Sequence, residues 1–322
     1  MTRNVFLTGA TGFVGSAIAR RLVGEDCGTL TCAVRNGAAK LPPSARVLSC
    51  LDFSINDGWQ DALAGIDIII HSAARVHVMN DTESDPLQAF RKVNVEGTLN
   101  LARQAVVAGV RRFIFVSSIK VNGEGTELGS PYRADDIPAP ADPYGVSKME
   151  AEQGLRELAA QTGLEVVIIR PVLVYGPGVK ANFLAMMRWL DKGVPLPFGA
   201  IHNRRSLVAL DNLVDLIHTC MTHPAAANQT FLVSDGEDLS TTGLLRRMAH
   251  ALDRSARLLP VPAWMLRTGA KFLGKSALSQ RLCGSLQVDI TKTRELLCWQ
   301  PPVSVDAALR AAAKYYQETS KK

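Results

Sequence analysis

The 322-residue sequence lacks any run of eighteen consecutive apolar residues, and its first apolar run, at Val5, breaks at once into glycines. We therefore expect neither a membrane-spanning helix nor a signal peptide. The six cysteines lack the CxxC pairing of a zinc site, which favours reduced, buried thiols in a cytoplasmic protein. The histidines lack a metal-ligand spacing supported by carboxylates, so we assign no metal.

A long run of one charge is also missing. The 36 basic and 30 acidic residues are spread along the chain, without the basic run typical of a nucleic-acid-binding arm. We expect no nucleic-acid partner and no integral membrane contact. The formal net charge of +6 suits an anionic small ligand, and the length allows about two domains.

A glycine-rich segment is present near the start. An apolar strand is predicted over Asn4–Thr8, and a helix with Ile18 and Leu22 on one face follows the glycines. This strand, glycine turn and helix are the context of a dinucleotide-binding fingerprint, in which glycines let the backbone approach a pyrophosphate at a helix N-terminus. We expect the cofactor to contact the residues of this turn, namely Gly9, Thr11, Gly12, Phe13, Val14 and Gly15.

The second predicted strand, Thr29–Val34, ends at Arg35, twenty residues beyond Gly15. An NAD site would carry an acidic residue there, whereas an arginine suits the 2′-phosphate of NADP. The sequence favours NADP(H), with NAD(H) possible and with a solvated loop arginine as the alternative interpretation.

Further strands alternate with helices along the chain. Asp52 and Phe53 follow a third strand, where Asp52 is a candidate for holding the adenine, and a fourth strand ends in the small residues Ala73 and Ala74. A long helix is predicted over 85–109, a fifth strand ends at Ser118, and a sixth precedes Pro171. This alternation predicts an α/β fold, a Rossmann-type doubly wound parallel sheet whose carboxyl edge forms the ligand crevice.

Tyr144 and Lys148 lie four residues apart at the start of a helix predicted over 144–162, so their side chains share one face. A nearby ammonium favours the phenolate, and we expect it to lower the pKa of Tyr144 and make this residue an acid/base. Ser118 is placed to hydrogen-bond the same carbonyl or alcohol. The alternative is a chance spacing on a solvated helix face.

These motifs recur together in a known order: the three glycines, Asp52, His71-x-Ala-Ala74, Asn94, Ser118, Tyr144-x-x-x-Lys148 and Arg170-Pro-Val-Leu-Val-Tyr-Gly-Pro177. The chain resembles the extended short-chain dehydrogenase/reductases, the NAD-dependent epimerase/dehydratase family, over nearly its whole length. The resemblance implies a catalytic triad of Ser118, Tyr144 and Lys148, with Lys148 also holding the nicotinamide ribose. It also implies that Asn94 and Pro171 lie at the cofactor site, Asn94 as a structural residue.

The sequence departs from the family pattern at two points. Dehydratases of the family carry an Asp-Glu pair where this chain has Ile119 and Lys120, so dehydration is disfavoured. Leu173 stands where many members use an asparagine on the nucleotide diphosphate. For the substrate, the candidates are His77, Ser118, Asn182, Phe198, Arg204 and Arg281, and a guanidinium suits a diphosphate.

We predict a cofactor-binding domain over 1–175 and 206–236, because 206–216 and 229–234 look like a return to the sheet. A smaller, mainly helical substrate lobe over 176–205 and 237–322 is interleaved with it. The basic, amphipathic stretch Trp264–Lys275 is predicted to pack on the core, with membrane-surface contact as the alternative. The resemblance further implies a homodimer formed through helices 85–109 and 144–162.

The function predicted from the sequence is NADPH-dependent reduction of the C4 ketone of a UDP-4-keto-6-deoxy-hexosamine in surface polysaccharide (O-antigen) synthesis. The segment after Ser117 resembles the UDP-4-keto-6-deoxy-N-acetylglucosamine 4-reductases. The alternatives are a UDP-hexose 4-epimerase with bound NAD, a reductase of a non-sugar ketone, and a redox-sensing binding protein without catalysis.

Overall fold

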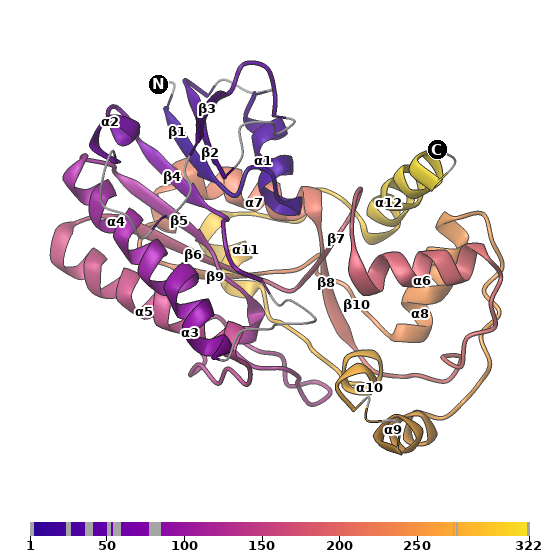
Figure 1. Ribbon diagram of the computed structural model, residues 1–322. Helices are drawn as coiled ribbons and strands as arrows, with labels where there is room; N and C mark the ends of the chain where they lie inside the picture. The colour runs from indigo at the N-terminus through magenta and orange to yellow at the C-terminus, as the bar shows by residue number, and fades with distance from the viewer. Residues whose placement is uncertain are drawn as a thin grey trace.

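The computed structural model describes residues 3–23, 27–35, 41–49, 53, 59–76, 85–272, 274 and 276–320. Its largest element is a seven-stranded sheet, visible in Figure 1, whose strands pair in parallel in the order β3-β2-β1-β4-β5-β6-β9. The strands are β1 (Val5–Thr8), β2 (Leu30–Val34), β3 (Arg46–Ser49), β4 (Ile68–His71), β5 (Arg112–Val116), β6 (Glu165–Pro171) and β9 (Thr230–Val233). The predicted Rossmann-type fold is confirmed.

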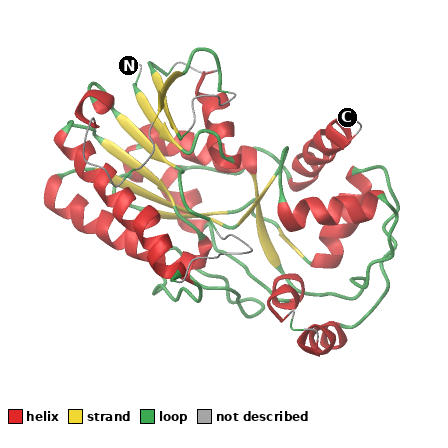
Figure 2. Cartoon of the chain, viewed as in Figure 1, coloured by secondary structure: helices red, strands yellow, loops and turns green. Residues whose placement is uncertain are grey.

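Helices cover both faces of this sheet (Figure 2). Every residue of β1, β4 and β5 is buried, as expected for strands covered on both sides. Alternate residues enter different cores: Leu7 packs with α1 (Phe13–Val23) and α7 (Leu210–Thr222), whereas Phe6 packs with helices of the opposite face. Those helices are α2 (Trp59–Leu63), α4 (Gly97–Val107) and α5 (Pro143–Thr162).

The strand order reverses between β1 and β4. After β3 at one edge of the sheet, the chain returns to place β4 beside β1, with Thr8 opposite His71. Ligand crevices of open α/β sheets form at such a reversal, outside the carboxyl ends of the strands. The glycine turn after β1 therefore lies where a nucleotide is expected.

The segment 85–109, predicted as one helix, is helical from Pro86 to Val107, with a π-helical turn between two α-helices. It consists of α3 (Pro86–Arg91), a π-helical turn (Lys92–Glu96) and α4. Asp85 caps its start by accepting a hydrogen bond from the Gln88 N–H at 3.2 Å. The π turn contains the buried Asn94, and such turns occur often at functional sites.

A second sheet has three strands, in the order β10 (Asp238–Leu239), β8 (Arg205–Ala209) and β7 (Leu173–Tyr175). The prediction that 206–216 returns to the main sheet was wrong for the strand in this segment, because β8 pairs with β7 and β10 in the second sheet. The following helix, α7, does pack against the main sheet, where it contacts β5 and β6. The strand within 229–234, β9, does join the main sheet beside β6.

The smaller lobe surrounds the second sheet with helices. A separate apolar core joins α6 (Ala181–Asp191), α8 (Thr241–Ala251) and α12 (Val305–Ser320), while α11 (Thr291–Leu297) packs beside β9. The remaining pair, α9 (Ala263–Phe272) and α10 (Ser276–Cys283), lies at the periphery of this lobe (Figure 1). Of the described helices, none has the length and apolar character needed to cross a membrane.

Candidate active site

The glycine turn between β1 and α1 has no room for a side chain at Gly9 or Gly15. Gly9 has a φ of +70°, and a Cβ on it would lie 2.7 Å from the Ala73 nitrogen. A Cβ on Gly15 would lie 2.1 Å from the Gly9 carbonyl oxygen. The N-terminus of α1 is thereby drawn against the turn, while Thr11 and Gly12 stay exposed. This open backbone suits a diphosphate, which fits the predicted dinucleotide site.

Hydrogen bonds join the end of β1 to the segment after β4. The Thr8 hydroxyl lies 2.9 Å from Nδ1 of His71, and it accepts a hydrogen bond from the Ala73 N–H at 3.2 Å. The Ser72 hydroxyl donates to the Thr8 carbonyl at 2.7 Å. Burial and the Lys148 charge lower the pKa of His71 to about 3, so its ring is neutral. Ala73 is therefore fixed directly beside Gly9. Its contact with a cofactor stays a prediction.

Asn94 connects three segments of the site. Its amide oxygen accepts from the Arg75 N–H at 2.8 Å, and its amide nitrogen donates to the Arg75 carbonyl and to the Ser147 hydroxyl, each at 3.0 Å. Ser147 in turn donates to the Tyr144 carbonyl at 2.8 Å. The π turn thus ties the segment after β4 to the first turn of α5, which agrees with a structural role for Asn94.

Ser118 lies just beyond β5 and caps a single 3₁₀ turn, Ile119–Val121. That turn approaches the start of α5 closely, because a Cβ on Gly145 would lie 2.8 Å from the Lys120 carbonyl oxygen. Asp142 caps α5 by accepting from the Gly145 N–H at 2.7 Å, and it also forms an ion pair with Lys120. These contacts bring the segment of Ser118 next to the helix turn that carries Tyr144.

Lys148 is buried, with 1% of its surface exposed. Its ammonium donates to the Val116 carbonyl at 2.9 Å and lies 4.3 Å from the centre of the Phe115 ring. Burial lowers the pKa of Lys148 to about 7, and the Glu152 charge opposes that shift.

The expected lowering of the Tyr144 pKa is not found. Burial raises this pKa, and the negative charge of Asp142 adds to the effect. Lys148 cannot offset this, because its own burial disfavours the charged ammonium. In the protein without a ligand, Tyr144 is therefore a neutral phenol, which is a proton donor.

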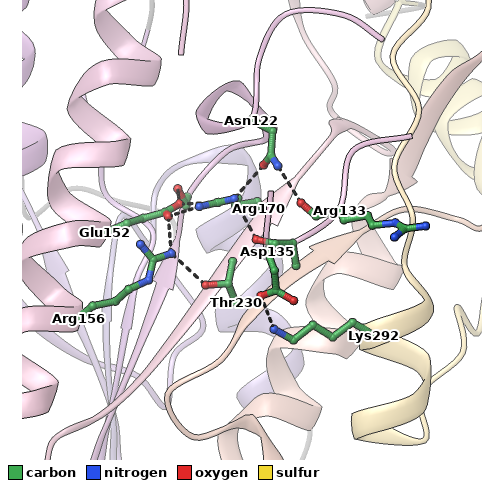
Figure 3. Close-up of polar contacts among 10 residues, drawn as sticks. Asn122, Arg133, Asp135, Glu152, Arg156, Arg170, Thr230 and Lys292 are labelled. Carbon is green, nitrogen blue, oxygen red and sulfur yellow. Dashed lines mark hydrogen bonds and ion pairs between the residues drawn. The ribbon is translucent and has the colours of Figure 1, made fainter. Parts of the chain in front are cut away.

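A buried ion pair joins α5 to β6 (Figure 3). Glu152 of α5 and Arg170 of β6 form two parallel hydrogen bonds, of 2.9 and 2.6 Å, with both side chains at least 99% buried. The Ser117 hydroxyl donates to Glu152 at 2.6 Å, and Arg170 donates to the Asn122 side chain at 2.9 Å. This network joins β5, β6, α5 and the 3₁₀ turn, which are the elements that position Ser118, Tyr144 and Lys148.

The sequence analysis did not select Glu152 or Asn122. One signal was available, since Glu152 lies four residues after Lys148 and so on the same buried face of α5. Its partner Arg170 was part of a quoted motif without an assigned contact.

Four further cofactor candidates, which are Arg35, Asp52, Phe53 and Pro171, lie in different surroundings. Arg35 is exposed and follows β2, the strand beside the glycine turn. Phe53 is half-buried and stacks on Trp59, with 5.7 Å between ring centres, and its carbonyl accepts from Asn100. Pro171 is the buried last residue of β6. Asp52, like the substrate candidate His77, lies outside the described residues.

Apart from Ser118 and His77, the substrate candidates lie on the smaller lobe. Asn182 is exposed in the first turn of α6, and Phe198 is half-buried against the core of this lobe. The Arg204 side chain is exposed, whereas its neighbour Arg205 is half-buried and donates to the Gly284 carbonyl at 3.2 Å. Burial lowers the pKa of Arg205, the Glu124 charge opposes that shift, and the Arg281 charge adds to it. The sequence analysis did not select Arg205, which lies near Arg281 and near Glu124, the partner of Lys120.

A cleft of about 830 Å³ lies between the segment after the 3₁₀ turn and the α9–α10 pair. Its lining includes 125–128, 200–203, Trp264, Arg267 and 283–285. Arg204 and Arg281 adjoin this lining without being part of it. Across the part of the chain that is described, no three His, Cys, Asp or Glu side chains are grouped so that they could hold a metal ion.

Comparison with known proteins identifies the family. The profile described as "NAD dependent epimerase/dehydratase family" matches residues 5–234. The chain belongs to this family. It is 48% identical over 321 residues to a UDP-glucose 4-epimerase of Vibrio cholerae, covering 99% of this chain and 97% of that one. The chain is thus an enzyme of this family, and the pyridine nucleotide expected from the glycine turn fits its site.

Solved structures share the fold. A UDP-glucose 4-epimerase of Thermotoga maritima, solved with UDP-glucose, superposes with a TM-score of 0.78 at 23% identity, covering 98% of this chain and 99% of that one. RMD of Pseudomonas aeruginosa, complexed with NADPH, gives a TM-score of 0.75 at 22% identity, covering 98% and 100%. The neighbours therefore include both an epimerase and an NADPH-bound protein, and neither supports a preference for NADP in this chain. The special resemblance to 4-reductases is not confirmed.

Proposed function

We propose that this enzyme is a UDP-hexose 4-epimerase. The observation that carries the proposal is the 48% identity with a UDP-glucose 4-epimerase along essentially the whole of both chains. Two features of the chain support it: the residues Ser118, Tyr144 and Lys148 are present, and the open backbone of the glycine turn suits a dinucleotide. This is the interpretation that the sequence analysis placed second.

Each residue of the triad has a chemical role in this proposal. Tyr144 takes the proton of the C4 hydroxyl while the C4 hydrogen leaves as hydride, and it returns the proton when the hydride comes back to the opposite face. Ser118 hydrogen-bonds the same oxygen throughout. Lys148 is one helical turn away and would bind the cofactor ribose. A bound pyridine nucleotide would supply the hydride acceptor and donor. The sugar is neither oxidised nor reduced overall.

The surroundings of Ser118 argue against a dehydratase. Ile119 is buried and apolar, and Lys120 is paired with Asp142 and Glu124. Neither position offers a carboxylic acid that could protonate a leaving hydroxyl. The site is equipped for hydride and proton exchange at one carbon, without elimination of water.

The second candidate is an NADPH-dependent 4-ketoreductase, with a UDP-4-keto-6-deoxy-hexosamine of surface polysaccharide synthesis as the substrate. Two observations favour it. Arg35 is exposed beside the cofactor turn, where a 2′-phosphate would lie. The raised pKa of Tyr144 keeps the phenol protonated, which is the state that carbonyl reduction requires. In epimerisation, Tyr144 must be a phenolate when it accepts the proton of the C4 hydroxyl. The epimerase proposal therefore requires that a positively charged group, such as the nicotinamide of NAD⁺, lowers the pKa of Tyr144 when it is bound.

One experiment separates the two functions. Purified protein is given UDP-glucose or UDP-N-acetylglucosamine with NAD⁺, and in parallel NADPH with a UDP-4-keto-6-deoxy sugar generated in place by a dehydratase. The epimerase proposal predicts interconversion of the C4 epimers, seen by NMR, with no net change in cofactor absorbance. Consumption of NADPH in step with the keto sugar, without interconversion of either UDP-hexose, would establish the reductase instead.

A further inference from the structure

The basic excess of this chain is concentrated in one segment. Residues 254–288 contain six basic residues and no acidic one, whereas the rest of the chain has 30 of each sign. The six are Arg254, Arg257, Arg267, Lys271, Lys275 and Arg281. The segment thus accounts for the whole formal charge of +6, which the sequence analysis had described as spread along the chain.

The helix in the middle of this segment, α9, does not bury its apolar residues. It has no buried residue, and Trp264, Met265 and Phe272 expose 68%, 48% and 87% of their surface. The prediction that this helix packs its apolar face on the core was therefore wrong. Its contact with the rest of the lobe is made mainly through α10 (Figure 1).

Helical geometry shows how the exposed residues are arranged. At 100° per residue, the half-buried Ala263, Leu266 and Ala270 share a narrow arc facing the protein. On the opposite side, Trp264, Phe272 and Met265 form an apolar strip. Arg267 and Lys271, which are both exposed, lie along one edge of that strip. Among the described ion pairs, none uses either of these two cations, and Arg267 donates a hydrogen bond to the Cys283 carbonyl of α10 at 3.2 Å.

We propose that this face of α9, made of Trp264, Met265, Arg267, Lys271 and Phe272, docks on an anionic phospholipid bilayer. Aromatic residues beside Lys and Arg on one helix face are the features of a helix that lies in the headgroup region, with its apolar strip inserted and its cations on lipid phosphates. A second copy of the chain is a poor occupant, because it would bring two segments of six positive charges together. The contact is peripheral, which agrees with the lack of a spanning helix among the described ones.

Docking in this way has a consequence for the cleft described above. Trp264 and Arg267 belong to its lining as well as to the exposed face of α9. The mouth of the cleft would therefore lie next to the lipid headgroups. The proposal concerns a surface outside the triad, and it holds whether the enzyme is an epimerase or a reductase.

Vesicle co-sedimentation tests the proposal with the full-length chain. The vesicles contain phosphatidylcholine alone or mixed with phosphatidylglycerol. The test variant is Lys271→Glu/Phe272→Ser, which touches neither the triad nor the cleft lining. The matched control is Lys314→Glu/Tyr315→Ser on α12, where a lysine and an aromatic residue are also adjacent and exposed. We expect binding to the anionic vesicles only, unchanged in the control and at least about tenfold weaker in the test variant.

Three outcomes would overturn the proposal. These are no binding to anionic vesicles, equal weakening in both variants, and concentration-dependent self-association that the test variant abolishes. A second readout uses tryptophan fluorescence, because Trp264 is the most exposed tryptophan among the described residues. We expect a blue shift with anionic vesicles that is lost in Trp264→Phe, and a shift that persists in this variant would count against insertion of α9.

Discussion

At the scale of single residues, the side chains of Tyr144 and Lys148 both lie where the surroundings disfavour the charged form. Burial keeps the Lys148 pKa near 7 and raises that of Tyr144. The protein without ligand is thus neutral at both positions for much of the time near pH 7. In the proposed mechanism, the charged forms of both side chains therefore depend on the bound cofactor and substrate.

Burial of Lys148 predicts a pH-dependent stability. The unfolded chain binds a proton at this amine below pH 10.5, but the folded protein does so only below about pH 7. Between these values the unfolded state binds more protons, so the Lys148 contribution to stability rises with pH. We expect the free energy of unfolding of the cofactor-free wild type, minus that of Lys148→Met, to rise from pH 7 towards pH 10 by up to about 1.4 kcal/mol per unit. Urea titrations measure it, and a difference independent of pH would contradict the buried-amine account.

Replacing Tyr144 by phenylalanine removes the hydroxyl and leaves the ring, which contacts Phe90 at 6.0 Å between ring centres. We expect turnover to fall by a factor of about 10² to 10⁴, as for loss of a general acid/base. Binding of cofactor, followed by the fluorescence of the reduced nicotinamide, should stay unchanged. Activity close to that of the wild type would show that Tyr144 is not the acid/base.

The sequence predicted these residues but not their environment. Ser118, Tyr144 and Lys148 follow from a local spacing and from the end of a strand. The Val116 carbonyl that binds Lys148 belongs to β5, and the Phe90 ring that packs against Tyr144 belongs to α3. A contact between residues 32 positions apart cannot be predicted from a local sequence pattern.

At the scale of elements, the glycine turn sets how closely α1 approaches β1. Gly15→Ala places a methyl group 2.1 Å from the Gly9 carbonyl oxygen, so the backbone must shift. We expect a loss of about 2 kcal/mol or more in stability together with weakened cofactor binding. The matched control is Gly269→Ala in α9, where no atom lies within 4 Å of the new methyl group. This change should be neutral or stabilising by up to about 1 kcal/mol. Similar melting temperatures for both variants would contradict the packing argument.

The ion pair between Glu152 and Arg170 joins α5 to β6. Glu152→Gln leaves the buried guanidinium without its counter-charge, and we expect a loss of about 3–5 kcal/mol in the free energy of unfolding. Glu157→Gln on the same helix is the control, because Glu157 is exposed and should change stability by less than about 0.5 kcal/mol. Denaturant titration compares them. Equal stabilities would mean that the network in Figure 3 contributes little.

Elements were predicted well where their apolar pattern is periodic. The strands of the main sheet and α5 appear within a few residues of their predicted bounds. Three features escaped prediction. The π turn at Lys92–Glu96 and the placement of β8 in a second sheet depend on tertiary contacts, and the exposure of α9 depends on what lies beside it. An amphipathic pattern indicates that one face of a helix is stabilised by contact with an apolar surface. It does not specify whether that surface belongs to the same chain.

At the scale of the whole molecule, the helices that cover one face of the main sheet remain our proposed dimer interface. Val93 and Val107 of the segment 85–109 are exposed there, at 39% and 65%. We predict a homodimer that is weakened by Val107→Asp, measured by light scattering after gel filtration. A wild-type monomer at working concentration would remove the proposal.

The central claim is that hydride leaves and returns to C4 of the same UDP-hexose, with Tyr144 moving the proton. Its most direct test is NMR of the product formed from UDP-glucose deuterated at C4. The account predicts UDP-galactose with the deuterium still at C4, formed about 10² to 10⁴ times more slowly by Tyr144→Phe. Loss of the deuterium to water during interconversion, or the absence of any UDP-galactose, would contradict it.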